Sequence, residues 1–277
     1  MLTASMIRRQ LERAGRHPQR ARGQNFLADS NVARAIVEHA GIGADDVVLE
    51  VGPGLGSLTI PIAQRARSVA TIEIDPHLVP LLEQNLADAG LENVSTIIAD
   101  ARDVTPGELL AAPTAILGNL PYNIGTQLTL TLLDRFPTAD RLIVTVQREV
   151  ADRFVAVPST KAFGAVTVKI ATFGTARLVM ALSQNVFVPR PNVASATVRI
   201  DRNSHTSVEM RAAVFPLITA GFAHRRKTLR HSLGSVLTDP VAICGAAGID
   251  VGRRAETLEL ADWCAVARAA SLVGPNG

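Results

Sequence analysis

The chain has 277 residues, of which 47% are hydrophobic, so it can bury one large domain and a smaller one and does not resemble a disordered chain. The formal net charge is only +3, and no uninterrupted apolar run reaches the ~20 residues of a membrane span. Residues Met1–Ala4 lack a long apolar stretch followed by a cleavage site, so export is not expected. We therefore expect a monomeric cytoplasmic protein.

The N-terminal segment, residues 1–22, is predicted to be a basic arm. It carries six arginines against one acid, Glu12; the arginines are Arg8, Arg9, Arg13, Arg16, Arg20 and Arg22. Clustered arginines suit contacts with nucleic-acid phosphates, although a solvated tail would have the same composition. After the polar turn Gly23–Leu27, an amphipathic helix is expected at Asn31–Ala40, with Asp29 or Ser30 as its N-cap.

A buried strand at Val47–Val51 opens into a glycine-rich turn, in which Gly52, Gly54 and Gly56 allow close approach of the backbone to a ligand. A helix is expected within Ser57–Ala66, and the next strand, Val69–Ile72, ends at Glu73. This acid follows Gly56 by 17 residues, which is typical of a carboxylate that binds ribose hydroxyls. A glycine turn alone could equally hold NAD or no ligand.

Two further strand ends carry polar side chains. After a helix near Pro76–Ala89, the strand Val94–Ile98 leads to Asp100, whose carboxylate can accept from an adenine amino group. The strand Thr114–Gly118 leads to Asn119. Open α/β sheets bind ligands at the carboxyl ends of their strands. A glycine turn and three polar residues at successive strand ends therefore indicate a nucleotide-like cofactor.

The tetrapeptide Asn119-Leu120-Pro121-Tyr122 suggests the reaction. The Asn119 side-chain carbonyl and the backbone carbonyl before Pro121 can accept the two hydrogens of an exocyclic amine on a nucleobase, which would make its nitrogen more nucleophilic. Pro121 stiffens the loop and has no N–H to compete. Tyr122 offers a flat face on which an unstacked base can lie. An ordinary turn after a strand would use the same residue types.

The rest of the chain predicts the end of the sheet and a helical domain. We expect strands at Leu142–Val146, Thr167–Thr172 and Thr175–Leu182, a helix at Glu149–Val155, and a strand at Ser195–Ile200 that closes the sheet. Asp201–Ser207 resembles a linker, and helical patterns follow from Val208. The fold class is therefore α/β, a doubly wound and mostly parallel sheet with a small C-terminal helical domain. The expected domains are residues 23–202 and 203–277, after the arm 1–22.

A second basic cluster lies in the helical domain. Its members, suited to RNA phosphates, are Arg225, Arg226, Lys227 and Arg230, and helical spacing would place Arg226 and Arg230 on one face. A charged helix face would account for the same residues. Cys244 and Cys264 lack metal-ligand spacing, as do the six histidines, so we expect buried thiols and no metal site.

Seven motifs occur in the order of a known family. They are GQNFL (23–27), EVGPGLG (50–56), IEID (72–75), GNLPYNI (118–124), QREVADRF (147–154), FVPRPNV (187–193) and HRRKTLRHSL (224–233). Together they resemble the KsgA family of ribosomal RNA adenine dimethyltransferases over residues 23–237. The macrolide-resistance methyltransferases and mitochondrial transcription factors of this fold are less similar at Leu120 and after His224.

The resemblance implies a Rossmann-like class I methyltransferase that uses S-adenosylmethionine. It implies that Asn25 and Leu27 touch this cofactor, with Gln24 positioning the lid that covers it. Gly52 and Gly54 would lie along the cofactor, Glu73 at its ribose and Asp100 at its adenine, and Asn119 would join the site. Phe187 is a candidate second aromatic wall for the target base, opposite Tyr122, but a core Phe is equally compatible. The implied reaction dimethylates two adjacent adenosines in a hairpin loop of 16S rRNA, in the small ribosomal subunit, during ribosome biogenesis.

Two other functions would account for some of these residues. A nicotinamide oxidoreductase would use the same glycine turn and acid, but Asn119–Tyr122 has no role in hydride transfer. A non-catalytic RNA-binding assembly factor could keep the fold, but it would not need Gly52, Glu73, Asp100 and Asn119 together. Methyl transfer to adenine in RNA therefore accounts for the largest number of motifs.

Overall fold

The computed structural model describes residues 2–19, 23–203 and 206–272, which form two compact units. The first comprises Met1–Ala151 and Ala176–Arg202, and the second Asp152–Thr175 and Asn203–Gly277. Residues 152–175 thus belong to the second unit and not to the expected domain 23–202. The reason is packing, because Phe163 and Val168 are buried with Leu217 and Ile218 of the C-terminal helices.

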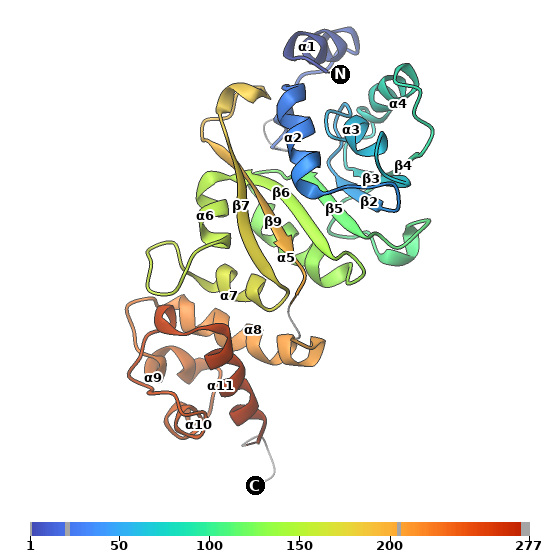
Figure 1. Ribbon diagram of the computed structural model, residues 1–277. Coiled ribbons are helices and arrows are strands. Elements are labelled where there is room, and N and C mark those ends of the chain that lie inside the picture. The colour runs from blue at the N-terminus through green and yellow to red at the C-terminus, as the bar shows by residue number, and fades with distance from the viewer. Residues whose placement is uncertain (1, 20–22, 204–205, 273–277) are drawn as a thin grey trace. The chain divides into compact units, whose positions relative to one another are not determined.

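A seven-stranded sheet with the order β4-β3-β2-β5-β6-β9-β7 is the framework of the first unit (Figure 1). Its strands are β2 (Val47–Val51), β3 (Ser68–Glu73), β4 (Val94–Ile98), β5 (Ala115–Asn119), β6 (Arg141–Gln147), β7 (Thr175–Leu182) and β9 (Ser195–Asp201). Strands β4, β3, β2, β5 and β6 are parallel, and β9 pairs antiparallel with β6. The expected doubly wound, mostly parallel sheet is confirmed.

The C-terminal edge of the sheet differs from the sequence expectation. Strand β9 lies between β6 and β7, so the edge is formed by β7 and not by Ser195–Ile200. Five of the seven residues of β9, Ser195–Val198 and Ile200, are buried, which suits an interior strand, whereas several residues of β7 are exposed. A strand with exposed residues tolerates the edge position because water can reach the backbone N–H and C=O groups that have no partner strand.

Helices connect the strands of the first unit. They are α2 (Ser30–Ala40), α3 (Thr59–Ala63), α4 (Val79–Asp88), α5 (Gly125–Arg135) and α6 (Arg148–Phe154), the last of which ends in the second unit, with 3-10 turns at Pro106–Glu108 and Gln184–Val186. Asp29 caps α2 by accepting from the Asn31 and Val32 N–H groups, as predicted. Ile36 of α2 and Ile62 of α3 pack with Val48 and Leu117 of the sheet.

The N-terminal arm contains a helix, α1 (Ala4–Arg13), that packs on the first unit. Ile7 and Leu11 are buried with Phe26, Leu55 and other apolar side chains. Arg8, Arg9 and Arg13 are exposed, whereas Arg20 and Arg22 lie outside the described residues. After this arm, β1 (Phe26–Leu27) pairs antiparallel with β8 (Phe187–Val188) in a two-stranded ribbon.

The second unit is helical. It contains α7 (Ala165–Ala171), α8 (Val208–Ala223), α9 (Leu229–Ser232), α10 (Pro240–Ala246) and α11 (Leu260–Leu272), with 3-10 turns at Leu233–Ser235 and Ala255–Thr257. Trp263 is fully buried in its core, and Cys244 and Cys264 are buried free thiols.

The predicted strand Thr167–Thr172 is wrong, because this segment forms most of helix α7. Thr167 favours the start of this helix: its hydroxyl accepts from the Gly164 N–H and donates to the Arg153 carbonyl. Val168 packs into the helical core, which offers no strand for the segment to pair with. Tertiary packing has overridden the β-branched composition here.

Candidate active site

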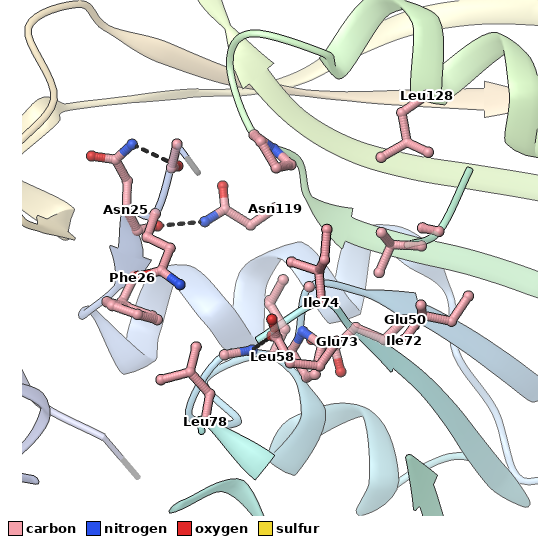
Figure 2. A pocket seen from close by; sticks show the side chains of 18 of the residues that line it. Asn25, Phe26, Glu50, Leu58, Ile72, Glu73, Ile74, Leu78, Asn119 and Leu128 are labelled. Carbon is pink, nitrogen blue, oxygen red and sulfur yellow. Dashed lines mark hydrogen bonds between the residues drawn. The ribbon is translucent and has the colours of Figure 1, made fainter. Parts of the chain in front are cut away.

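Four predicted site residues meet because their strands are neighbours in the sheet. Asp100, Glu73, Gly52 and Asn119 follow or end β4, β3, β2 and β5, which lie in that order. All four line one cavity of about 280 Å³, within the first unit (Figure 2). Parallel strands place their carboxyl ends at one edge, so this convergence is a direct result of the topology.

The glycine-rich turn lies against the cavity with its backbone. Gly52 has φ +72° and Gly54 φ +55°, which side-chain-bearing residues rarely adopt. A Cβ on Gly54 would lie 2.9 Å from the ring of Phe26, so a side chain would also collide there. The turn therefore offers backbone groups to a ligand, and Leu55 and Ser57 continue the lining.

Glu73 is buried and holds this turn. One carboxylate oxygen accepts from the Gly54 N–H at 3.1 Å, and the other accepts from the Asp75 N–H at 2.9 Å. Burial raises the pKa of Glu73 above its ordinary value, although these backbone hydrogen bonds oppose the shift. Each oxygen retains a second lone pair, with which it can accept from a ligand.

Asp100 lies at the cavity rim and pairs with Arg102, a residue that the sequence analysis did not single out. The Arg102 guanidinium donates to both carboxylate oxygens, with the shortest contact at 2.6 Å. These hydrogen bonds lower the pKa of Asp100. Arg102 also lines the cavity, so the adenine end of the predicted site contains an ion pair and not a lone carboxylate.

Asn119 connects the cavity to the segment Gly23–Leu27. Its side-chain nitrogen donates to the Asn25 carbonyl at 2.7 Å, and its side-chain oxygen points away from this bond (Figure 2). Gly23 lies close to Pro121, because a Cβ on Gly23 would be 3.1 Å from the Pro121 Cβ. The segment assigned to cofactor binding by resemblance thus contacts the tetrapeptide that carries the predicted chemistry.

The other residues of the tetrapeptide have different environments. Leu120 is buried, and its N–H donates to the Thr145 carbonyl, which anchors the turn on β6. Pro121 lines the cavity. Tyr122 is half-buried, and its hydroxyl shares a short hydrogen bond with that of Ser195. Burial raises the pKa of Tyr122, so its hydroxyl keeps its proton at neutral pH.

Leu27 and Phe187 are core residues of the ribbon β1–β8. They are 4% and 3% exposed and share a cluster with Ala33 and Ile36. At this burial, neither face of the Phe187 ring is open to a base. Its role as a second aromatic wall stays a prediction. Leu27 nevertheless borders the cavity, and its carbonyl accepts from the Ser57 hydroxyl at 2.6 Å.

Glu50, the first residue of the motif at 50–56, is a further residue that lines the cavity. It is 1% exposed, and its Oε2 has no hydrogen-bond partner among the described residues. Burial, reinforced by the neighbouring Glu73, raises the pKa of Glu50 to about 8, although the Thr59 hydroxyl opposes the shift. The only available signal was a glutamate at the end of an otherwise apolar strand.

The second basic cluster is exposed in the second unit. Arg226 and Lys227 lie in the turn between α8 and α9, and Arg230 lies in α9, so the expected helical spacing of Arg226 and Arg230 is wrong. Helix α8 ends at Ala223, before this turn. Arg225 donates to the Lys161 carbonyl and pairs with Glu256 at 3.3 Å. Its side chain thus has a structural partner within the unit.

Residues 2–19, 23–203 and 206–272 contain no helix that is both long and apolar enough to cross a membrane. Within the same ranges, no three or more His, Cys, Asp or Glu side chains are grouped so as to hold a metal ion.

Comparisons with known proteins agree on one family. The family model of ribosomal RNA adenine dimethylases matches residues 17–271. The ribosomal RNA small subunit methyltransferase A of Bifidobacterium longum subsp. infantis is 41% identical over 99% of this chain and 95% of its own length. The protein of that name from Corynebacterium diphtheriae is 42% identical over 95% of this chain and 92% of its own.

Solved structures agree on the fold. A dimethyladenosine transferase from Plasmodium falciparum has a TM-score of 0.74 at 21% identity, covering 87% of this chain and 95% of its own. The 23S rRNA methyltransferase ErmE has a TM-score of 0.67 at 26% identity, covering 89% and 100%. The chain therefore has the Rossmann-like fold of class I methyltransferases.

Proposed function

Since the chain belongs to the ribosomal RNA adenine dimethylase family, we propose that it dimethylates the exocyclic amines of two adjacent adenosines in a hairpin loop of 16S rRNA. The methyl donor is S-adenosylmethionine, and the substrate is the small ribosomal subunit or a precursor of it. The reaction belongs to ribosome biogenesis in the cytoplasm, and the enzyme acts as a monomer.

One observation carries this proposal most strongly. Asn119 lines the cavity at the end of β5, and its amide nitrogen is already bonded to the Asn25 carbonyl. The amide oxygen is therefore the part of this side chain that remains to accept from a ligand. An acceptor beside a cofactor cavity suits a primary amine of a nucleobase, which has two hydrogens to donate.

The cavity residues fit S-adenosylmethionine. Positive φ angles at Gly52 and Gly54 bring bare backbone to the wall, where a nucleoside or amino-acid portion can approach closely. Glu73 has lone pairs for ribose hydroxyls, and Asp100, held ionised by Arg102, can accept from an adenine amino group. Two acids, Glu50 and Glu73, line the same cavity, and a ligand with positive charge would favour their ionised forms.

The protein's part in the reaction is orientation. The cofactor, when bound, supplies a methyl group on a sulfonium, which is already a strong electrophile. Asn119 and the carbonyl of Leu120, the residue before Pro121, would accept the target N–H groups and direct the nitrogen lone pair into the cavity. Tyr122 would support the plane of the base. Alignment of this kind can lower a barrier by several kcal/mol, on the order of 7–11 in the best cases.

RNA docking is assigned to exposed arginines and lysines. The cluster Arg226, Lys227 and Arg230 in the second unit and Arg8, Arg9 and Arg13 on α1 in the first are exposed. Phosphate contacts supply most of the affinity of such proteins for nucleic acid. Arg225 can share in this role through the part of its guanidinium that Glu256 does not occupy.

Labelled S-adenosylmethionine tests the proposed function. We expect label in adenines of unmethylated small subunits, with two methyl groups on each of two adjacent bases, measured by nuclease digestion and mass spectrometry. Protein-free large-subunit RNA is the comparison substrate, because ErmE shares the fold. Label confined to large-subunit RNA would contradict the proposed substrate. Absence of label from every RNA would contradict the proposed reaction.

A further inference from the structure

Helix α1 makes two separate connections to the glycine-rich turn Gly52–Gly56. One is apolar and passes through Phe26, and the other is polar and passes through Asn85. The family model begins at residue 17, after the end of this helix. We propose that α1 is a positioning element of the cofactor site, which holds the glycine-rich turn in its binding conformation; this inference rests on the proposed function.

The apolar connection begins with the buried face of α1. Ile7 is fully buried and Leu11 is 3% exposed, and both share a cluster with Phe26, Leu55 and Leu78. These last three side chains also line the cavity, so α1 covers the outer side of the cavity wall. The ring of Phe26 lies so close to Gly54 that a Cβ would collide with it. Shortening the side chains of Ile7 or Leu11 would therefore loosen the contact of the Phe26 ring with the turn.

The polar connection is a chain of amides. Gln10 of α1 donates to the Asn85 side-chain oxygen at 2.5 Å and accepts from its nitrogen at 3.1 Å. The same Asn85 nitrogen donates to the Leu55 carbonyl, within the turn, at 2.8 Å. Asn85 is 5% exposed, so its amide depends on these partners. Gln10 thereby fixes the orientation in which Asn85 can hold Leu55.

The two connections reach different groups of the same turn. Phe26 limits the backbone at Gly54 from one side, and Asn85 fixes the carbonyl of Leu55. A helix that merely covered apolar surface would need only the first connection. The amide chain adds a directional contact, which is the kind of restraint that keeps a backbone turn in one conformation.

Variants of the full-length protein separate positioning from simple packing. We expect Gln10→Ala to weaken S-adenosylmethionine binding by about three- to tenfold, the effect of one hydrogen bond, in titration calorimetry. Leu11→Ala should weaken it further. In steady-state assays the KM for S-adenosylmethionine should rise while kcat changes little, because the turn contacts the cofactor and not the target base.

Matched controls come from the exposed side of the same helix. Glu12→Ala removes a long polar side chain next to Leu11, and Met6→Ala removes a partly exposed apolar one. Both should leave cofactor affinity unchanged. In an Asn85→Ala background, Gln10→Ala should have no further effect, because the amide chain is already broken.

Hydrogen exchange gives a readout that does not depend on the proposed function. In ligand-free Gln10→Ala, the amides of Gly52, Gly54, Leu55 and Gly56 should exchange faster, while those of β5 and β6 keep the wild-type rate. Unchanged exchange and unchanged cofactor affinity in Gln10→Ala would overturn the inference, even if Leu11→Ala failed to fold. Absence of S-adenosylmethionine binding by the wild-type protein would instead contradict the proposed function, with the exchange result still deciding the role of α1.

Discussion

Asn119 shows how one side chain can divide two tasks between its two polar atoms. Its nitrogen donates to the Asn25 carbonyl, and in the reaction we propose its oxygen would accept from the target amine. We expect Asn119→Ala to reduce methyl transfer by at least about a hundredfold while cofactor binding falls only a few-fold, because a misoriented nucleophile loses most of the benefit of alignment. Single-turnover assays and calorimetry measure the two effects. The control is Asn31→Ala, an exposed asparagine of α2. Turnover within a few-fold of wild type would remove Asn119 from the reaction.

Glu73 lines the same cavity and holds the glycine-rich turn. Its carboxylate already accepts from the Gly54 and Asp75 N–H groups, so its loss would free the turn as well as remove acceptors for ribose. We expect Glu73→Ala to weaken S-adenosylmethionine binding by tenfold or more, since each charge-assisted hydrogen bond is worth about 1.5–3 kcal/mol. Glu83→Ala, on the exposed side of α4, should bind like wild type. Equal affinities in calorimetry would exclude Glu73 from cofactor binding.

Glu50 should make the stability of the protein depend on pH. Its pKa is raised from the ordinary 4.5 to about 8, so between these values the folded state keeps a proton that the unfolded state loses. The free energy of unfolding should therefore fall as pH rises from about 4.5 to about 8, by up to about 1.4 kcal/mol per pH unit. Glu50→Gln should flatten this slope. Urea unfolding at a series of pH values measures it, and parallel slopes for both proteins would show that Glu50 ionises normally.

At the scale of secondary-structure elements, the turn between α8 and α9 concentrates positive charge. We expect replacement of Arg226, Lys227 and Arg230 by Ala to flatten the salt dependence of subunit binding, because each lost phosphate contact removes about 0.7–0.9 from the slope of log affinity against log salt. Cofactor affinity should not change, since the cavity lies entirely in the first unit. Filter binding across a salt series measures the slope.

Arg225 provides the contrast for this experiment. Because it pairs with Glu256 and donates to the Lys161 carbonyl, Arg225→Ala should mainly lower the stability of the second unit and change the salt slope less. A slope that is unchanged in the triple variant would mean that the turn does not contact RNA. The exposed arginines of α1 would then be the next candidates.

At the scale of the whole molecule, the chain folds as two units with separate cores. A Cβ on Gly221 of α8 would lie 2.3 Å from Trp263, in the core of the second unit. We expect Gly221→Ala to destabilise the second unit by about 1–3 kcal/mol, the usual cost of overpacking. Thermal unfolding followed by Trp263 fluorescence measures this, and S-adenosylmethionine binding should persist at 25 °C. Gly234→Ala, which meets no atom within 4 Å, is the control and should unfold like wild type.

The sequence by itself determined most strands of the sheet and the set of residues at their ends. Short runs of apolar and β-branched residues and glycine punctuation are local signals, so the bounds of β2 and β4 match the structure residue for residue. Glu73, Asp100 and Asn119 could be assigned to one edge because parallel strands bring their carboxyl ends together. The family motifs could likewise be read without coordinates, because each is contiguous along the chain.

Only the tertiary structure decided which partners these residues have. The segment Thr167–Thr172 has the composition of a strand, but its first five residues belong to helix α7, because the segment packs among the helices of the second unit. The ion pair of Asp100 with Arg102, the burial of Glu50 beside Glu73 and the bond from Asn119 to Asn25 each depend on the position of a second group. The amide chain from Gln10 through Asn85 to Leu55 joins residues that are 75 and 30 positions apart, and no periodicity along a chain encodes such contacts.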